Sequence, residues 1–198
     1  MALRVGIAGY GLAGRYFHAP LLKGCGFEVA SILTNNQLRA SHALEDFPDT
    51  KVVTTMQELL SNNLDLVVVA SANLAHAEQA TAALKAGIPV VVDKPMGRNL
   101  VETKSIVELS DSLGVPVTTF FNRRWDSDAL TIKKVLASGV LGQIHRMDSR
   151  FERFRPDVNK DSWRESMSVR KMNGNLSKRR SADASVFQRT HERTNTLI

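Results

Sequence analysis

Residues 4–14 read Arg-Val-Gly-Ile-Ala-Gly-Tyr-Gly-Leu-Ala-Gly, and this stretch decides the fold. Its apolar first half predicts a short strand over Val5–Ala8, after which three glycines complete a Gly-x-Gly-x-x-Gly turn. In such a turn the first glycine allows the tight bend and the second leaves room for a pyrophosphate. The third lets the following helix pack closely against the strand, and the start of that helix offers free N–H groups to the phosphates. The sequence therefore predicts a dinucleotide site made by Gly9, Gly11, Leu12, Ala13 and Gly14.

The charge distribution favours a domain that handles small metabolites. The chain has 198 residues and a formal net charge of +6, but residues 166–198 contain five more basic than acidic side chains. The first 165 residues are therefore nearly neutral, which argues against a surface that binds a nucleic-acid backbone. We accordingly expect no nucleic-acid partner.

Hydropathy and cysteine content bear on the compartment. The longest apolar runs, 64–70 and 88–92, are too short to cross a bilayer. Residues 5–14 are assigned to the first strand and the glycine turn, so we expect no secretion signal there. Cys25 is the only cysteine, which excludes an internal disulfide and a cysteine-based metal cluster. We therefore expect a cytoplasmic protein with no membrane contact and no metal site.

Strands and helices are predicted to alternate at the spacing of a parallel sheet. After the first helix, the predicted strands cover 27–33, 51–54, 64–70, 89–92 and 117–121. The predicted helices between them cover 38–45, 56–61, 74–86 and 101–113, and Gly87 and Gly114 end the last two. The almost entirely apolar strand 64–70 is typical of a sheet with helices on both faces. The pattern predicts an α/β fold, a doubly wound Rossmann domain over residues 1–122.

The pattern changes after this domain. An amphipathic helix is predicted over 126–138 and an alternating, extended strand over 143–154, which together would open a second, α+β domain spanning 123–165. Residues 166–198 have no sustained periodicity and are rich in Ser, Arg, Asn and Thr, so we predict a basic, disordered tail. The second domain would then be incomplete.

The segment after the second predicted strand bears on the choice of cofactor. An acidic residue about 20 positions past the glycine turn usually hydrogen-bonds the adenosine ribose. Here Thr34, Asn35 and Asn36 occupy that region without a carboxylate. Their hydroxyl and amide groups can donate hydrogen bonds to a 2′-phosphate, so we predict NADP, with NAD possible. Arg39 either reaches this phosphate or is a solvated charge on a helix, and the sequence leaves both interpretations open.

A lysine follows the fifth predicted strand, in Asp93-Lys94-Pro95. Ligands of open α/β sheets bind over the carboxyl ends of the strands. A lysine placed there beside an acid can polarise a hydroxyl or carbonyl and take part in proton transfer. Lys94 is therefore a candidate catalytic residue, and the alternative is an ordinary surface lysine.

Together these features resemble the Gfo/Idh/MocA oxidoreductases, the relatives of glucose-fructose oxidoreductase and inositol dehydrogenase. Three stretches are most similar to the subgroup that contains NADP-dependent scyllo-inositol dehydrogenases: Phe17-His18-Ala19-Pro20, residues 122–128 and residues 151–156. The resemblance covers residues 3 to about 165. Its motifs, in order, are Gly9-Tyr10-Gly11-Leu12-Ala13-Gly14, Ser71-Ala72-Asn73 with His76, Asp93-Lys94-Pro95 and Asn122-Arg123-Arg124-Trp125-Asp126.

The resemblance implies roles for individual residues. Lys94 matches the family's lysine that contacts the oxygen of the reacting carbon and helps to move its proton. The resemblance also implies that several residues border the cofactor, in addition to the glycine turn, Thr34 and Asn35. These are Ser71, Asn73, His76, Asp93, Lys94, Asn122 and Arg123.

The chain departs from the family after Trp163-Arg164-Glu165. Relatives continue with a glycine-rich turn and a helix that bears an Asp and a His, the usual acid/base partner of the lysine. This chain continues instead with Ser166-Met167-Ser168, and His191 lies in an unrelated context. We therefore expect a truncated or frame-shifted family member that lacks most of the family's oligomer interface and has little turnover.

The resemblance implies an NAD(P)-dependent oxidoreductase that oxidises a secondary alcohol of a small polyol or sugar, as inositol dehydrogenases do. The alternative is a non-catalytic NAD(P)-binding sensor or regulator that keeps the fold without the chemistry. Lys94 favours the enzyme, whereas the missing Asp/His helix favours the alternative.

Overall fold

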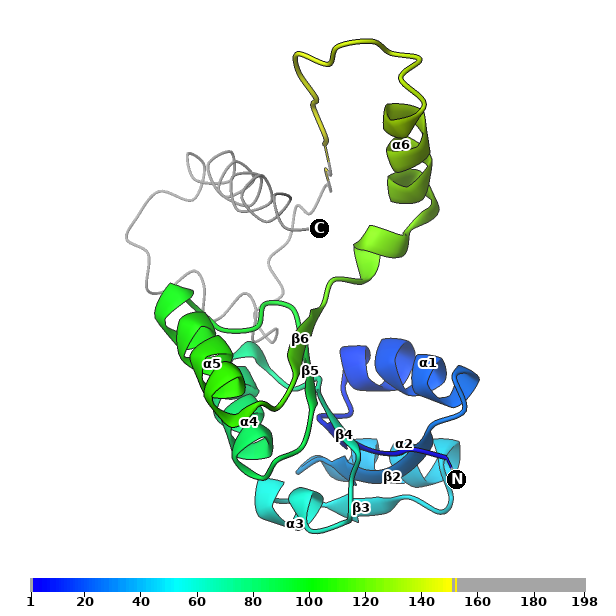
Figure 1. Cartoon of the computed structure of the whole chain (residues 1–198). Helices are drawn as coiled ribbons and strands as arrows, with labels where there is room; N and C mark the ends of the chain where they lie inside the picture. Colours follow the sequence, from blue (N-terminus) through cyan, green and yellow to red (C-terminus); the bar gives the residue numbers. More distant parts are fainter. Residues whose placement is uncertain (1, 151, 153–198) are drawn as a thin grey trace, which may run out of the picture. The chain divides into compact units, whose positions relative to one another are not determined.

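A computed structural model of the chain describes residues 2–150 and 152 (Figure 1). One compact unit spans Met1–Gly142, and a second begins at Gln143. The boundaries predicted at 122 and 165 stay predictions. The tail predicted over 166–198 lies outside the described residues.

A six-stranded parallel sheet forms the centre of the first unit. Its order is β3-β2-β1-β4-β5-β6, so the first strand lies between the second and the fourth. This is the order of a doubly wound Rossmann sheet, a fold that binds its ligands at the carboxyl edge where the strand order reverses, here between β1 and β4. The strands are β1 (Arg4–Ala8), β2 (Glu28–Leu33), β3 (Lys51–Val53), β4 (Leu66–Val69), β5 (Val90–Asp93) and β6 (Val117–Phe120).

Helices connect the strands and cover both faces of the sheet, as predicted. The connecting helices are η1 (Gly14–His18), α1 (Ala19–Gly24), α2 (Gln37–Asp46), α3 (Met56–Leu60), α4 (Asn73–Lys85) and α5 (Leu100–Leu113). Two more, η2 (Asn122–Trp125) and α6 (Ser127–Ala137), follow β6. The first helix begins within the glycine turn as predicted, but its η1 segment has the wider π-type turn, which the sequence pattern did not predict.

Strand β4 shows how the sheet is buried. Val67 and Val69 pack into a core with α3, α4 and α5, whereas Val68 packs into a second core with α1 and α2. Figure 1 shows α4 and α5 on one side of the sheet and α1 on the other. Because β4 is covered on both faces, its side chains are apolar at successive positions rather than at alternate ones.

Two glycines end helices as expected. Gly87 follows α4 with φ 75°, and Gly114 follows α5 with φ 64°. Both lie in the left-handed region, where a residue with a Cβ is disfavoured.

The strand predicted over 143–154 is wrong for the residues that can be compared. Residues 143–150 and 152 form no strand. A strand is held by hydrogen bonds to a neighbouring strand, and none of the described residues pairs with this segment. The alternation of polar and apolar side chains was compatible with a strand, but it could not show whether a neighbouring strand is present to pair with it. Among the described helices, none is long and apolar enough to span a membrane.

Candidate functional site

The carboxyl ends of the parallel strands bring most of the predicted site residues to one edge of the sheet. Ala8 of β1 lies opposite Leu33 of β2 and Val69 of β4, and Asp93 of β5 lies opposite Phe120 of β6. The residues that follow these positions therefore share that edge. They are Gly9, Thr34, Ser71, Lys94 and Asn122.

Two glycines of the turn are required by the packing of the protein itself. Gly9 has φ 101°, and a Cβ on it would lie 2.6 Å from the Cα of Ser71. A Cβ on Gly14 would lie 2.1 Å from the carbonyl oxygen of Gly9. Gly9 also donates its N–H to the carbonyl of Leu33 at 2.9 Å. The turn is therefore fixed against both β2 and the segment after β4.

Gly11 differs, because no protein atom crowds it. The nearest atoms to a Cβ built on Gly11 belong to the Arg39 guanidinium, and Nη1 lies 3.6 Å away. Leu12 beside it is 60% exposed, and Ala13 is the N-terminal capping residue of η1. The open surface beside Gly11 therefore suits an approaching phosphate group.

A network under the turn fixes the start of the first helix. The Asp46 carboxylate accepts hydrogen bonds from Arg15 Nε at 2.7 Å and from the Tyr10 hydroxyl at 2.9 Å. The Arg15 guanidinium holds the pKa of Asp46 below its usual range, and burial together with Asp46 raises the pKa of Tyr10. The glycine turn is thereby tied to the end of α2.

The predicted adenosine end of the site carries no carboxylate at positions 34–36. Thr34 is buried, and its Oγ1 accepts the backbone N–H of Asn36 at 3.3 Å, whereas Asn35 is exposed. Asn36 caps α2, where its Oδ1 accepts the N–H of Arg39 at 3.0 Å. Arg39 is exposed and its guanidinium lies beside Gly11 of the glycine turn, so both interpretations of Arg39 stay open. It has no ion pair with any described residue.

Lys94 lies at the carboxyl end of β5. The Asp93 carboxylate accepts the backbone N–H of Lys94 at 2.9 Å, which shapes the first step of the loop. The lysine side chain is exposed, and within residues 2–150 its amine has neither a hydrogen bond nor an ion pair. The amine is therefore available to a ligand bound over the edge.

His76 connects the two loops on either side of this edge. Its side chain is 1% exposed, with Nδ1 2.8 Å from the carbonyl oxygen of Pro95 and Nε2 3.1 Å from that of Ser71. The Ser71 hydroxyl donates to Gln79 Oε1 at 2.7 Å. His76 thus supports the loops after β4 and β5 from inside the protein, and its direct contact with a cofactor stays a prediction.

His18 is a residue whose place the sequence did not predict. It is 4% exposed, its ring centroid lies 4.4 Å from that of Phe120, and its Nε2 lies 3.9 Å from Asp93 Oδ1. Burial lowers the pKa of His18, and the Asp93 carboxylate opposes that shift. The sequence signal that could have indicated this burial is the position of His18 in a helix that covers the apolar strands.

The remaining predicted residues lie at the starts of helices. Asn73 is the first residue of α4 and Asn122 the first of η2. Arg123 donates from Nη1 to Asp126 Oδ2 at 3.0 Å, and Trp125 is 77% exposed. Their proximity to a cofactor stays a prediction.

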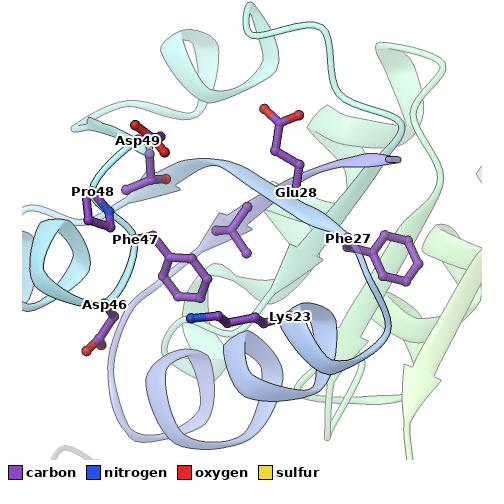
Figure 2. A pocket seen from close by; sticks show the side chains of 9 residues that line it. Lys23, Phe27, Glu28, Asp46, Phe47, Pro48 and Asp49 are labelled. Atoms are coloured by element: carbon purple, nitrogen blue, oxygen red, sulfur yellow. The ribbon is translucent and has the colours of Figure 1, made fainter. Parts of the chain in front are cut away.

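A pocket of about 290 Å³ lies elsewhere, at the amino ends of β2 and β3 (Figure 2). Figure 2 shows the Lys23 side chain beside the Phe47 ring, with the Lys23 amine 5.7 Å from the centre of that ring. Glu28 opens β2 and Thr50 precedes β3, so this pocket is separate from the carboxyl edge.

The residues at the carboxyl edge suit a diphosphate-linked nucleotide. The open space beside Gly11 leaves room for a phosphate group, and the neighbouring Arg39 guanidinium, which has no ion pair among the described residues, supplies positive charge. The carboxyl edge between β1 and β4, where the strand order reverses, is where an open α/β sheet binds such a ligand.

Comparison with known proteins agrees with this geometry. The family model of the Gfo/Idh/MocA oxidoreductases, described as an NAD-binding Rossmann fold, matches residues 3–121. The uncharacterised oxidoreductase YdgJ of Escherichia coli K12 is 44% identical over 165 residues, which cover 82% of this chain and 46% of YdgJ. The scyllo-inositol 2-dehydrogenase (NADP(+)) IolW of Bacillus subtilis is 37% identical over 82% of this chain and 45% of its own.

A solved structure from Yersinia pestis, described as an oxidoreductase, is 40% identical and superposes with a TM-score of 0.76. It covers 83% of this chain, which in turn covers 47% of it. The chain thus spans about half the length of the curated relatives it matches. On the strength of the family match and the shared fold, the chain belongs to the Gfo/Idh/MocA family of oxidoreductases. Residues 3–121 match the NAD-binding Rossmann domain of that family.

Proposed function

We propose that this chain is the cofactor-binding part of an NADP(H)-dependent oxidoreductase that oxidises a secondary alcohol of a polyol or sugar. The observation that carries the proposal is the arrangement of the phosphate turn and Lys94 along one edge of the sheet. The similarity to the scyllo-inositol 2-dehydrogenase (NADP(+)) of Bacillus subtilis supports the substrate class.

Oxidation of an alcohol removes a hydride from carbon and a proton from oxygen, and a bound nicotinamide supplies the hydride acceptor. The protein must therefore orient the hydroxyl group and accept its proton. In the proposed mechanism the Lys94 amine contacts the hydroxyl oxygen and receives that proton. Asp93 holds the backbone of Lys94, and His76 holds the carbonyl of Pro95. General acid–base assistance of this kind contributes about 10²–10⁴-fold in rate.

The proposed preference for NADP rests on charge at the adenosine end. A carboxylate after β2 would repel a 2′-phosphate, and residues 34–36 contain none. The Arg39 guanidinium, unpaired within the described part of the chain, lies beside the phosphate turn. An arginine near this position accommodates the 2′-phosphate of NADP in the Rossmann fold.

Titration calorimetry with 2′,5′-ADP and with 5′-ADP tests the cofactor preference. We expect tighter binding of 2′,5′-ADP by wild type, and a loss of about 10- to 100-fold in that affinity for Arg39→Ala, the range typical of a hydrogen bond to a charged group. Binding of 5′-ADP should change little. Lys51→Ala is the matched control, since Lys51 is an exposed cation that begins β3 at the opposite edge. Equal affinities of Arg39→Ala and wild type for 2′,5′-ADP would contradict this part of the proposal.

NADP⁺ reduction across a panel of inositols and sugars tests the activity. We expect Lys94→Ala to keep its affinity for NADPH and to lose turnover, whereas Lys85→Ala, at the far end of α4, should behave as wild type. Failure of wild type to bind NADPH would refute the proposal.

A further inference from the structure

Lys94 is flanked by two residues, and a buried histidine faces each of them. His76 of α4 contacts the carbonyl of Pro95 on one side. His18 of η1 faces the carboxylate of Asp93 on the other, with 3.9 Å between Nε2 and Oδ1. Neither the glycine turn nor the proton transfer assigned to Lys94 explains why His18 faces the Asp93 carboxylate.

His18 is the last residue of the wide turn at the start of the first helix. Residues Gly14–His18 form a π-type turn, a feature that often marks functional sites within helices. The ring packs at an angle of 50° against Phe120, the last residue of β6. His18 therefore belongs to the helix that starts in the phosphate turn, yet it contacts the ends of β5 and β6.

The Nε2 atom of His18 is buried and has no hydrogen-bond partner in the described part of the chain. An unpaired buried polar atom is costly, so such a group calls for an explanation. The gap to Asp93 exceeds a direct hydrogen bond, but a small shift of either side chain, or one bridging water, would close it. The carboxylate in turn accepts the N–H of Lys94, so a chain of contacts runs from η1 to the lysine.

We propose that His18 is a positioning residue for Lys94, in which an Nε2–H holds the Asp93 carboxylate and thereby the backbone of Lys94 beside the bound cofactor. This inference rests on the proposed function, since it assumes that NADPH binds over the same edge. It also links the helix that binds the diphosphate to the loop that carries the amine. Simple packing against Phe120 would need no polar atom at this place.

Two substitutions separate positioning from packing. His18→Gln keeps an N–H donor at a reach similar to that of Nε2, whereas His18→Leu fills the space beside Phe120 without a donor. The readout is the rate at which an amine-reactive reagent labels Lys94, measured by mass spectrometry with and without NADPH. The exposed Lys104 of α5 serves as the internal reference. Thermal unfolding and NADPH titration are recorded for each variant.

We expect NADPH to slow the labelling of Lys94 by about tenfold in wild type and in His18→Gln, which corresponds to about 1.4 kcal/mol. In His18→Leu the protection should fall to about twofold or less, although the variant is folded and binds NADPH. A packing role predicts the reverse order, because leucine suits an apolar contact better than glutamine does.

The outcomes distinguish the inference from the proposed function. If His18→Leu keeps the protection seen in wild type, or if both variants lose it equally, the positioning role is refuted while the proposed function stands. If NADPH binds but protects Lys94 in no form of the protein, the inference is refuted while the proposed function stands. If NADPH binds to no form of the protein, the proposed function fails and the inference falls with it.

Discussion

Replacement of Gly11 by alanine is expected to weaken NADPH binding while leaving the stability of the fold nearly unchanged. A Cβ at this position would have the Arg39 guanidinium as its nearest neighbour, at 3.6 Å, which is ordinary van der Waals contact. The backbone of Gly11 is not in the left-handed region, so an L-residue fits without strain. We therefore expect the free energy of unfolding of Gly11→Ala to stay within about 1 kcal/mol of that of wild type.

NADPH binding should suffer because the methyl group would fill the space that the pyrophosphate needs. Overpacking of a close contact costs about 1–3 kcal/mol. At about 1.4 kcal/mol for each factor of ten, the dissociation constant should rise by about 10- to 100-fold. Titration calorimetry with NADPH measures this change, and thermal unfolding without ligand measures the stability.

Gly14→Ala is the matched control for Gly11→Ala. Its Cβ would lie 2.1 Å from the Gly9 carbonyl oxygen, so the backbone itself would have to move. We expect a loss of about 3 kcal/mol or more in the free energy of unfolding, or about 6–12 °C in Tm. Wild-type affinity of Gly11→Ala for NADPH would refute the assignment of the phosphate turn. Unfolding of Gly11→Ala as early as Gly14→Ala would refute the packing argument.

Three other substitutions test separate parts of the structure. Thr34→Asp should lower NADPH affinity by about 10- to 100-fold and shift the preference to NADH in calorimetry, since a carboxylate there opposes the 2′-phosphate; a wild type that prefers NADH would contradict this. Asp46→Asn should destabilise the fold at neutral pH, as followed by chemical denaturation. Because Arg15 lowers the pKa of Asp46 in the folded state, the stability difference should be full above about pH 4 and shrink as the pH falls through the lowered pKa; a difference independent of pH would contradict the pairing. Thr55→Ala should cost about 1 kcal/mol in thermal unfolding, because Thr55 caps α3 through the N–H of Glu58, and an unchanged Tm would count against the capping box.

The sequence predicted the sheet well because its signals are local. The glycine turn fixed the first strand and helix, and the apolar strand before Ser71 required helices on both faces. Gly87 and Gly114 ended α4 and α5 through their own backbone conformation. Parallel strands then brought Gly9 and Lys94 to one edge, since carboxyl ends of such strands share an edge.

The contacts of individual side chains could not be predicted in the same way. His18 ends a π-type turn, packs against Phe120 of β6 and lies near Asp93, and neither the turn nor these contacts have a local signal in the sequence. His76 was expected beside the cofactor, but its burial against Pro95 follows from the packing of α4. The strand predicted over 143–154 is wrong for the described residues for a related reason. A strand needs a neighbouring strand, and the presence of that neighbour is not encoded in the segment itself.

Arg39 is an intermediate case, in which two local rules would have sufficed if combined. The Asn36 side chain caps α2, so the helix begins at Gln37 and Arg39 lies in its first turn. Side chains of a helix point toward its N-terminus, and the N-terminus of α2 follows β2 at the carboxyl edge of the sheet. A long side chain in that turn is therefore directed back toward the neighbouring phosphate turn, where the guanidinium is found beside Gly11. The Asn36 cap thus sets the position of Arg39, the residue proposed to bind the 2′-phosphate. It does so by fixing where the helix begins, without contacting the cofactor itself.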